Sequence, residues 1–156
     1  MNYWLMKSEP DVFGIDHLKK MPKKTEHWDG VRNYQARNMM RDDMKKGDLV
    51  FFYHSNCAEP GIVGIMKVVR EGYPDHTAFD PETKYYDPKS DPDNPRWYMV
   101  DVQYQRHTKR LVSLAELKQY EELEESTLVR KGNSLSIMPC TNHEWDFILE
   151  LENTKP

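Results

Sequence analysis

Three short stretches of the chain carry side chains that could bind a planar, hydrogen-bonding ligand. In each stretch, polar groups follow an apolar run or a turn, and two of the stretches also hold an aromatic ring. Aromatic rings stack on nucleobases, each stack contributing about 1–3 kcal/mol, and a carboxylate can accept a hydrogen bond from the exocyclic amine of a base. The candidate residues are Ser8, Glu9, Trp28, Asn33, Tyr53, His54 and Ser55. They predict a pocket in which Trp28 or Tyr53 supplies the stacking face.

The same residues leave an enzymatic alternative open. His54 beside Ser55, with Glu9 or Asp48 nearby, could form a hydrolytic set that acts on a nucleotide or a modified base. The sequence has no Gly-x-Ser-x-Gly motif, no phosphate-binding Gly-Lys-Ser/Thr loop and no dinucleotide fingerprint. Its six histidines lack the spacing of metal ligands. We therefore favour a binding protein without metal or cofactor over an enzyme that uses His54 and Ser55.

A basic segment could contact the phosphates of a nucleic acid. Residues 19–46 hold nine Lys or Arg and four acidic residues, a net charge of +5, whereas the whole chain carries −4. Lysine and arginine bind phosphates by neutralising their charge, although charge runs commonly serve only to solvate a helix surface. The candidate phosphate contacts are Lys19, Lys20, Lys23, Lys24, Arg32, Arg37 and Arg41.

Two neighbouring strands would position the central part of this pocket. Residues 48–55 form a β-branched and aromatic run, and residues 61–69 form a second run after a Pro-Gly turn. Gly61 and Gly64 mark a bend or a close backbone approach in the second run. We expect adjacent antiparallel strands in a small curved barrel of about five or six strands, with residues 53–55 at its mouth.

Shorter elements surround these strands. Apolar runs predict strands over residues 3–6, 96–105 and 135–138. Apolar spacing and capping residues predict helices over 15–21 and 34–44, after Ser113, over 125–131 and after Thr141. Asn33 is a suitable N-cap for the second of these helices, and Trp145, Ile148 and Leu149 would face inward from the last one.

Residues 73–95 change in character, because they are rich in proline and aspartate. Long loops of this kind are usually functional or disordered. Phe79, Tyr85 and Tyr86 could anchor the segment to the rest of the fold, so we expect an ordered loop that borders the pocket.

The overall composition fits one folded domain over residues 1–156. Aromatic residues make up 12% of the chain, which argues against disorder. No apolar run is long enough to span a membrane, and the N-terminus does not have the pattern of a signal peptide. Two cysteines are too few for a disulfide scaffold or a zinc site. We expect a monomer in the cytoplasm, or in the nucleus if the source is eukaryotic.

Several longer motifs strengthen the case for nucleic-acid binding. They read Tyr-Trp-Leu-Met-Lys-Ser-Glu-Pro at 3–10, Trp-Asp-Gly-Val-Arg-Asn-Tyr-Gln-Ala-Arg-Asn at 28–38, Phe-Tyr-His-Ser at 52–55, Tyr-Tyr-Asp-Pro-Lys-Ser at 85–90, Pro-Arg-Trp at 95–97 and Ser-Ile-Met-Pro at 136–139. In this order and over nearly the whole chain, they resemble the EVE domain family. Cys140 departs from the family pattern, in which valine is commoner, and only a packing effect is expected.

The resemblance implies an α+β, PUA-like fold, in which short helices flank a small curved mixed β-barrel. It also implies a non-catalytic reader that holds a flipped, modified base, a modified cytosine in DNA or alternatively a base in RNA. The positions that match the family are Lys7, Ser8, Glu9, Trp28, Arg32, Asn33, Tyr53, His54, Ser55 and Pro139. Lys7 and Pro139 enter the predicted pocket through this resemblance alone.

Overall fold

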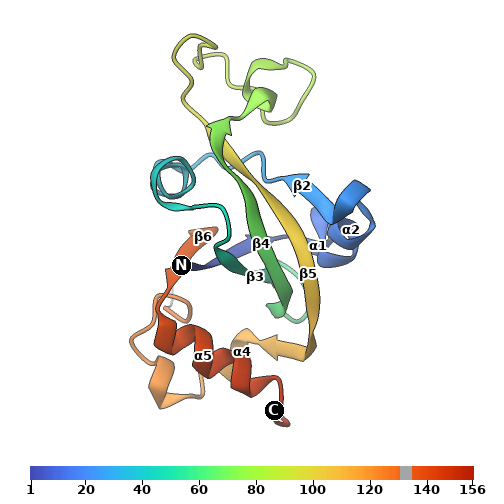
Figure 1. The fold of residues 1–156 in the computed structure, drawn as a ribbon, viewed down its shortest axis with the longest axis vertical. Helices are drawn as coiled ribbons and strands as arrows, with labels where there is room; N and C mark the ends of the chain where they lie inside the picture. The colour runs from blue at the N-terminus through green and yellow to red at the C-terminus, as the bar shows by residue number, and fades with distance from the viewer. Residues whose placement is uncertain (131–134) are drawn as a thin grey trace.

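The computed structural model describes residues 1–130 and 135–156, and a six-stranded mixed sheet forms its centre (Figure 1). The strands are β1 (Tyr3–Ser8), β2 (Thr25–His27), β3 (Leu49–His54), β4 (Gly61–Pro74), β5 (Tyr98–Ser113) and β6 (Ile137–Cys140). They lie in the order β2-β5-β4-β3-β1-β6. The predicted α+β class and the curved mixed sheet with short flanking helices are confirmed.

The predicted neighbouring strands are adjacent and antiparallel. β3 pairs with β4 from Leu49 opposite Lys67 to His54 opposite Gly61. β4 continues to Pro74, so it includes the first residues of the segment that we expected to be a loop. A β-carbon on Gly64 would lie 2.0 Å from a side-chain carbon of Ile15, so the predicted close approach exists at this glycine.

We expected a small curved barrel of about five or six strands; the sheet has six strands and is curved, but it is open. In the part of the chain that the structure describes, the edge strands β2 and β6 do not pair with each other. The pairing of the two longest strands, β4 and β5, shifts register at several points. Such irregularities increase the local twist and bend a sheet, which explains its curvature without closure.

The parallel pairing of β1 with β3 places two predicted site segments together. Ser8 lies opposite His54, so the carboxyl ends of both strands meet at one edge of the sheet. The Ser55 amide donates a hydrogen bond to the Ser8 carbonyl oxygen at 3.0 Å, which fixes this edge.

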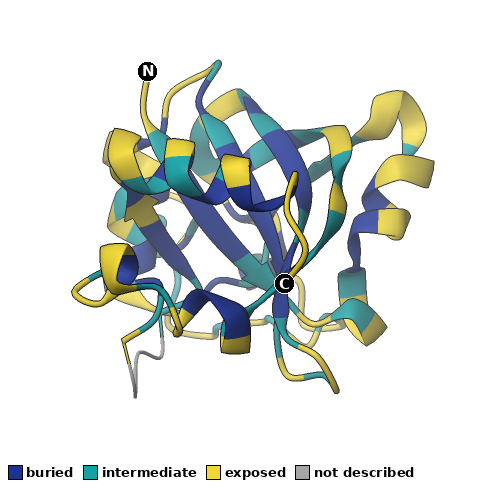
Figure 2. Ribbon diagram, turned by 90° about the horizontal axis from the view of Figure 1, so that it is seen from below, coloured by how far each residue is buried: buried dark blue, intermediate teal, exposed yellow. Residues whose placement is uncertain are grey.

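Alternating side chains of these strands build a core on each face of the sheet. The central strands are largely buried (Figure 2). Phe52 packs on one face with Trp28 and the helices α2 (Ile15–Lys20) and α3 (Tyr34–Asn38). Phe51 packs on the other face against α5 (Asn142–Leu151), where its ring stacks on Trp145 at 3.9 Å between centroids. The two faces therefore have different surroundings.

The remaining helices are short turns. They are α1 (Pro10–Phe13), the 3-10 turns η1 (Pro22–Lys24), η3 (His76–Phe79) and η4 (Glu121–Leu123), the π-helical turn η2 (Met39–Asp43), and α4 (Leu114–Leu117). The helix predicted over 34–44 is thus α3 followed by η2. The helix predicted over 125–131 was wrong for residues 125–130, which form turns, and Lys131 lies outside the described residues.

Three of the predicted helix caps are present. The Ser113 side chain accepts a hydrogen bond from the Glu116 amide at 3.1 Å at the start of α4. The Asn33 side chain accepts a hydrogen bond from the Ala36 amide at 3.0 Å. Thr141 and Glu144 form the complete capping box that opens α5. Trp145 and Ile148 are buried as predicted, while Leu149 is only half-buried.

Candidate functional site

A cavity of about 500 Å³ opens beside the carboxyl end of β1. This volume lies within the range of roughly 300–1,000 Å³ that is common for small-molecule sites. Aromatic rings, carboxylates and cationic groups all contribute to its walls. The lining residues include Lys7, Ser8, Glu9, Val12, Phe13, Glu26, His27, Trp28, Asp29, Gly30, Val31, Arg32, Lys84, Tyr85 and Ser136.

Trp28 is a firmly held ring of the cavity wall. Its amide donates to the Val100 carbonyl oxygen at 2.8 Å. Its indole meets Phe13 and Phe52 edge-on, with centroids 6.3 and 5.4 Å away. Only 7% of Trp28 is exposed, so it forms part of the core as well as the wall of the cavity.

The short helix α1 forms the part of the rim that follows β1. The Ser8 hydroxyl donates to the Phe13 carbonyl oxygen at 2.7 Å. The amides of Val12 and Phe13 both donate to the Glu9 carbonyl oxygen. The hydroxyl of Ser8 therefore holds the rim in place, and its oxygen keeps the capacity to accept a further hydrogen bond.

The loop after β4 supplies Tyr85 to the wall. A β-carbon on Gly30 would lie 2.5 Å from the Tyr85 ring, so glycine is needed for this close approach. Gly30 also has a φ of +78°, which favours glycine. The prediction that the loop borders the cavity is confirmed, since Lys84 and Tyr85 line it.

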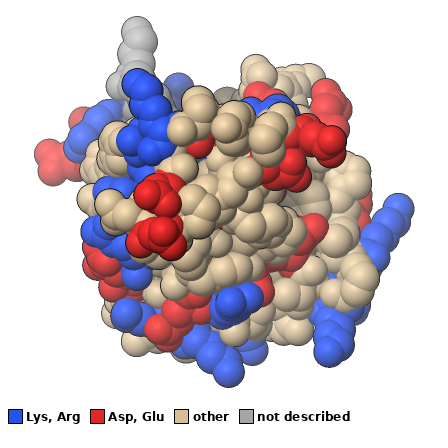
Figure 3. Space-filling view, turned by 90° about the horizontal axis from the view of Figure 1, so that it is seen from above, with Lys and Arg blue, Asp and Glu red and all other residues tan. Residues whose placement is uncertain are grey.

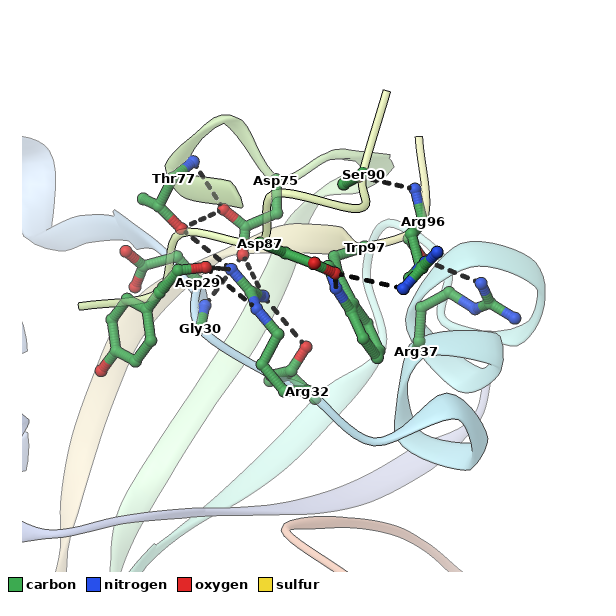
Figure 4. A network of polar contacts seen from close by, with 12 residues as sticks. Asp29, Gly30, Arg32, Arg37, Asp75, Thr77, Asp87, Ser90, Arg96 and Trp97 are labelled. Atoms are coloured by element: carbon green, nitrogen blue, oxygen red, sulfur yellow. Dashed lines mark hydrogen bonds and ion pairs between the residues drawn. The ribbon is translucent and has the colours of Figure 1, made fainter. Parts of the chain in front are cut away.

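A buried carboxylate joins this loop to the cavity (Figure 4). Asp75 accepts hydrogen bonds from the Gly30 amide at 2.8 Å and from Arg32 Nη1 at 3.0 Å. It also accepts from the amide and the hydroxyl of Thr77. Arg32 Nη2 in turn donates to the Tyr85 carbonyl oxygen at 2.6 Å. The network fixes both Gly30 and Tyr85.

Electrostatics in this network favour the ionised carboxylate. Burial alone would raise the pKa of Asp75, but the hydrogen bonds from Thr77, Gly30 and Arg32 outweigh burial and lower the pKa. Arg32 is therefore committed to contacts within the protein. We predicted that Arg32 lines the base pocket and contacts phosphate. It lines the cavity, but its guanidinium donates hydrogen bonds to Asp75 and to the Tyr85 carbonyl oxygen.

Side-chain hydrogen bonds also hold the second half of the loop in place. The Trp97 indole donates to Asp87 at 2.7 Å, and Arg37 donates to the Arg96 carbonyl oxygen at 2.8 Å (Figure 4). Trp97 is 6% exposed and stacks against Tyr34 at 4.8 Å between centroids. Trp97 is therefore a buried residue of the core.

Titratable groups of the cavity differ in their environments. Burial raises the pKa of Asp29, an effect that the nearby His27 partly offsets. Burial also lowers the pKa of Lys7. His27 lies between two carboxylates, with Nδ1 2.8 Å from Glu26 and Nε2 3.7 Å from Asp29. The cavity therefore offers both acceptors and donors to a ligand.

The structure brings only part of the predicted pocket together. The predicted residues that line the cavity are Lys7, Ser8, Glu9, Trp28 and Arg32. Asn33, Tyr53, His54, Ser55 and Pro139 are not among its lining residues.

Tyr53 lies on the other face of the sheet because side chains alternate along β3. It is 3% exposed and belongs to the core around Trp145, whereas Phe52 packs beside Trp28. Burial raises the pKa of the Tyr53 phenol to about 12. The stacking role predicted for Tyr53 is therefore incompatible with its position.

His54 is committed to the backbone beside α1. Its Nε2 accepts a hydrogen bond from the Ile15 amide at 3.1 Å, and burial lowers its pKa. A ring nitrogen that accepts this bond is not free to act as a base. The Ser55 amide donates to the Ser8 carbonyl oxygen, so both members of the predicted pair have contacts that hold this edge of the fold.

Two other predicted residues that do not line the cavity, Asn33 and Pro139, have different roles. Asn33 caps α3. Pro139 belongs to β6 and lies opposite Trp4 of β1. It lines a separate cavity of about 320 Å³ near the N-terminus.

The candidate phosphate contacts divide into two groups. Arg41 pairs with Asp42 at 2.8 Å, and Arg37 binds a loop carbonyl, so both already have partners. The four lysines are exposed and lie on α2 and η1; they are Lys19, Lys20, Lys23 and Lys24. In the view of Figure 3, blue side chains lie mainly towards the margins, and acidic side chains separate them.

Several residues that line the cavity were not among the predicted site residues. Phe13, Glu26 and His27 stand in short elements whose orientation no periodic pattern reveals. Lys84 was not singled out, and Tyr85 was expected only as an anchor of the loop. The Trp-Asp-Gly turn was a usable signal for Asp29, because glycine there permits a close approach.

Two kinds of feature are absent from residues 1–130 and 135–156. No cluster of His, Cys, Asp or Glu in these ranges could hold a metal ion. None of the helices described there has the length and apolar character needed to cross a membrane.

Comparisons with known proteins agree with this architecture. Residues 2–151 match the EVE domain family. Human thymocyte nuclear protein 1 is 50% identical over 171 residues, which cover 99% of this chain and 76% of the relative. A structure of human THYN1 protein in complex with 5-methylcytosine-containing DNA has a TM-score of 0.95 and 50% identity, with all of both chains covered. A protein from Pseudomonas putida has a TM-score of 0.91 and 49% identity, over 96% of this chain and 99% of that one. The chain therefore belongs to the EVE domain family.

Proposed function

We propose that this protein is a non-catalytic reader that holds a flipped, modified cytosine of DNA in the cavity beside β1. The likeness to human THYN1 protein supports this function, since that protein was solved in complex with DNA containing 5-methylcytosine. RNA remains the second candidate partner, because single-stranded bases are also recognised by stacking and edge contacts.

The observation that carries the proposal is the composition of the cavity wall. Phe13, Trp28 and Tyr85 offer apolar ring surface for a base and for an added methyl group. Glu9 and Asp29 offer acceptors for the exocyclic amine of cytosine. Burial raises the pKa of Asp29, an effect that His27 partly offsets. One cavity thus combines a stacking surface with groups that can read the edge of a base.

The energies of these contacts are sufficient for base flipping. Extrusion of a paired base costs a few kcal/mol. One stack contributes about 1–3 kcal/mol, and each hydrogen bond contributes about 0.5–1.5 kcal/mol net. A stack with two or three hydrogen bonds therefore offsets the cost by a narrow margin, and loss of one wall should abolish most of the preference for the modified base.

Binding fits the environment of His54 better than catalysis does. The Nε2 lone pair of His54 accepts from the Ile15 amide, and this histidine is not among the lining residues of the cavity. The enzymatic alternative rested on His54 acting as a base. A histidine that stabilises the turn before α2 instead supports a binding role.

Phosphate contacts would come from the exposed lysines of α2 and η1. β2, which contributes Glu26 and His27 to the cavity, directly follows Lys23 and Lys24 in the chain. Lysines in this position could hold the backbone of a strand whose base enters the cavity. Arg32, Arg37 and Arg41 are weaker candidates because of their internal partners.

The test compares duplexes with and without one 5-methylcytosine at a fixed salt concentration. The wild-type protein should prefer the methylated duplex. Tyr85→Ala removes one wall of the cavity and should abolish most of this preference, while salt-sensitive background binding persists. Tyr53→Phe is the matched control and should bind as the wild type does. Full discrimination by Tyr85→Ala would show that the base is held elsewhere.

A further inference from the structure

One apolar side chain projects to solvent at the rim of the cavity. Among the residues that the structure describes, the exposed large hydrophobic residues are Met1, Val12, Tyr34 and Tyr86. Val12 is 51% exposed, and it alone of these four lines the cavity. Val12 therefore places an exposed apolar side chain at the entrance of the cavity.

The turn that carries Val12 is held rigidly. Pro10 occupies the first turn of α1, where its fixed φ suits the helix. The Ser8 hydroxyl ties the end of the turn by donating to the Phe13 carbonyl oxygen at 2.7 Å. The Gly14 amide donates to His17 Nδ1, also at 2.7 Å. The turn is therefore preorganised, which limits the entropy lost when it contacts a partner.

Adjacent side chains of this turn have opposite surroundings. Phe13 packs edge-on against Trp28 within the cavity wall. Val12 is more than half exposed. A base that entered the cavity beside Phe13 would leave its former position in the duplex next to Val12.

We propose that Val12 is a wedge that fills the gap left in the base stack when the modified cytosine turns into the cavity. The inference rests on the proposed function. Flipping leaves a space between neighbouring base pairs, and apolar side chains stabilise such openings by inserting between base steps. Val12 is a side chain of this kind at the entrance of the cavity.

The charges around Val12 fit contact with bases better than contact with phosphates. Glu9 and Asp11 are exposed on the same turn, and carboxylates repel phosphate groups. The guanine left without its partner presents N–H donors, including its N2 amine. The exposed Asp11 carboxylate, next to Val12 in the chain, is an acceptor for such donors.

The experiment measures binding to two probes of one sequence, a duplex with one 5-methylcytosine and the methylated single strand alone. Only the duplex has a stack to be filled. Val12→Ala should weaken binding to the duplex about tenfold and change binding to the single strand less than about twofold. Val12→Leu should retain duplex binding because it keeps an apolar wedge. Tyr86→Ala is the control, since it removes an exposed ring that does not line the cavity.

The outcomes separate the wedge from the proposed function. Equal losses on both probes, or no loss on the duplex, would overturn the wedge while the reader function stands. Failure of Val12→Leu to retain duplex binding would also overturn it. If the wild-type protein bound neither methylated probe above its unmethylated counterpart, the proposed function would fall and the wedge with it.

Discussion

Replacement of Asp75 with asparagine tests how the loop after β4 is held. The carboxylate is fully buried and accepts hydrogen bonds from Gly30, Arg32 and both donors of Thr77. Asparagine has a similar shape, but one of its two terminal atoms is a donor. Loss of one partner from a buried ion pair costs about 3–5 kcal/mol. The Arg32 side chain keeps 24% exposure, so water can partly solvate it, and we expect a loss of about 3 kcal/mol, at the lower end of that range.

The same substitution predicts a change in the pH dependence of stability. The folded-state pKa of Asp75 is lowered, whereas its unfolded-state pKa is about 3.9. The stabilisation by Asp75 is therefore fully present above the unfolded pKa, and it is lost as the pH falls through the folded pKa. The difference in unfolding free energy between wild type and Asp75→Asn should be largest at neutral pH and should shrink below about pH 4.

Urea denaturation at a series of pH values measures both quantities. Asp93→Asn is the control, because Asp93 is an exposed carboxylate of the same loop. A loss below about 1 kcal/mol at neutral pH would refute the assignment of Asp75 as the residue that holds the loop. If the difference in unfolding free energy between wild type and Asp75→Asn stayed constant at acidic pH, the lowered pKa of Asp75 would be refuted.

Three further perturbations test other parts of the molecule. Replacement of Lys23 with glutamine should weaken binding to methylated and unmethylated DNA alike and reduce the salt slope by about one; an unchanged slope after all four lysines of α2 and η1 are neutralised would contradict phosphate binding there. Tyr53 should stay protonated to about pH 12 in an absorbance titration that compares wild type with Tyr53→Phe, and ionisation near pH 10 would contradict its burial. Asp11→Asn should weaken binding to the methylated duplex, since it removes an exposed acceptor for the unpaired guanine; stronger binding to all duplexes would instead show that this carboxylate only repels phosphates.

The local sequence predicted the strands and caps well, because their signals are short-range. The apolar run before His54 and the Asn33 cap depend on neighbouring residues in the chain. The open sheet was not predicted, since closure depends on the accumulated register shifts between β4 and β5. Those shifts arise from packing between segments that are distant in sequence.

The candidate site was predicted less completely for a related reason. The end of a strand can be found from its sequence, but the face on which each side chain emerges depends on register. Tyr53 was therefore assigned to the pocket although it packs on the opposite face. The ion pair between Arg32 and Asp75 joins residues 43 positions apart, so a positive charge that suggested phosphate binding belongs to a structural network.

The central claim is that the modified base lies inside the cavity, and the nuclear Overhauser effect can test it directly. The probe is a duplex with one 5-methylcytosine whose methyl group carries an isotope label, bound to the protein in solution. The account predicts contacts from this methyl group to ring protons of Phe13, Trp28 or Tyr85, together with loss of its contacts to the neighbouring bases of its own strand. Intact contacts to the neighbouring bases in the bound duplex, without contacts to these rings, would contradict the account.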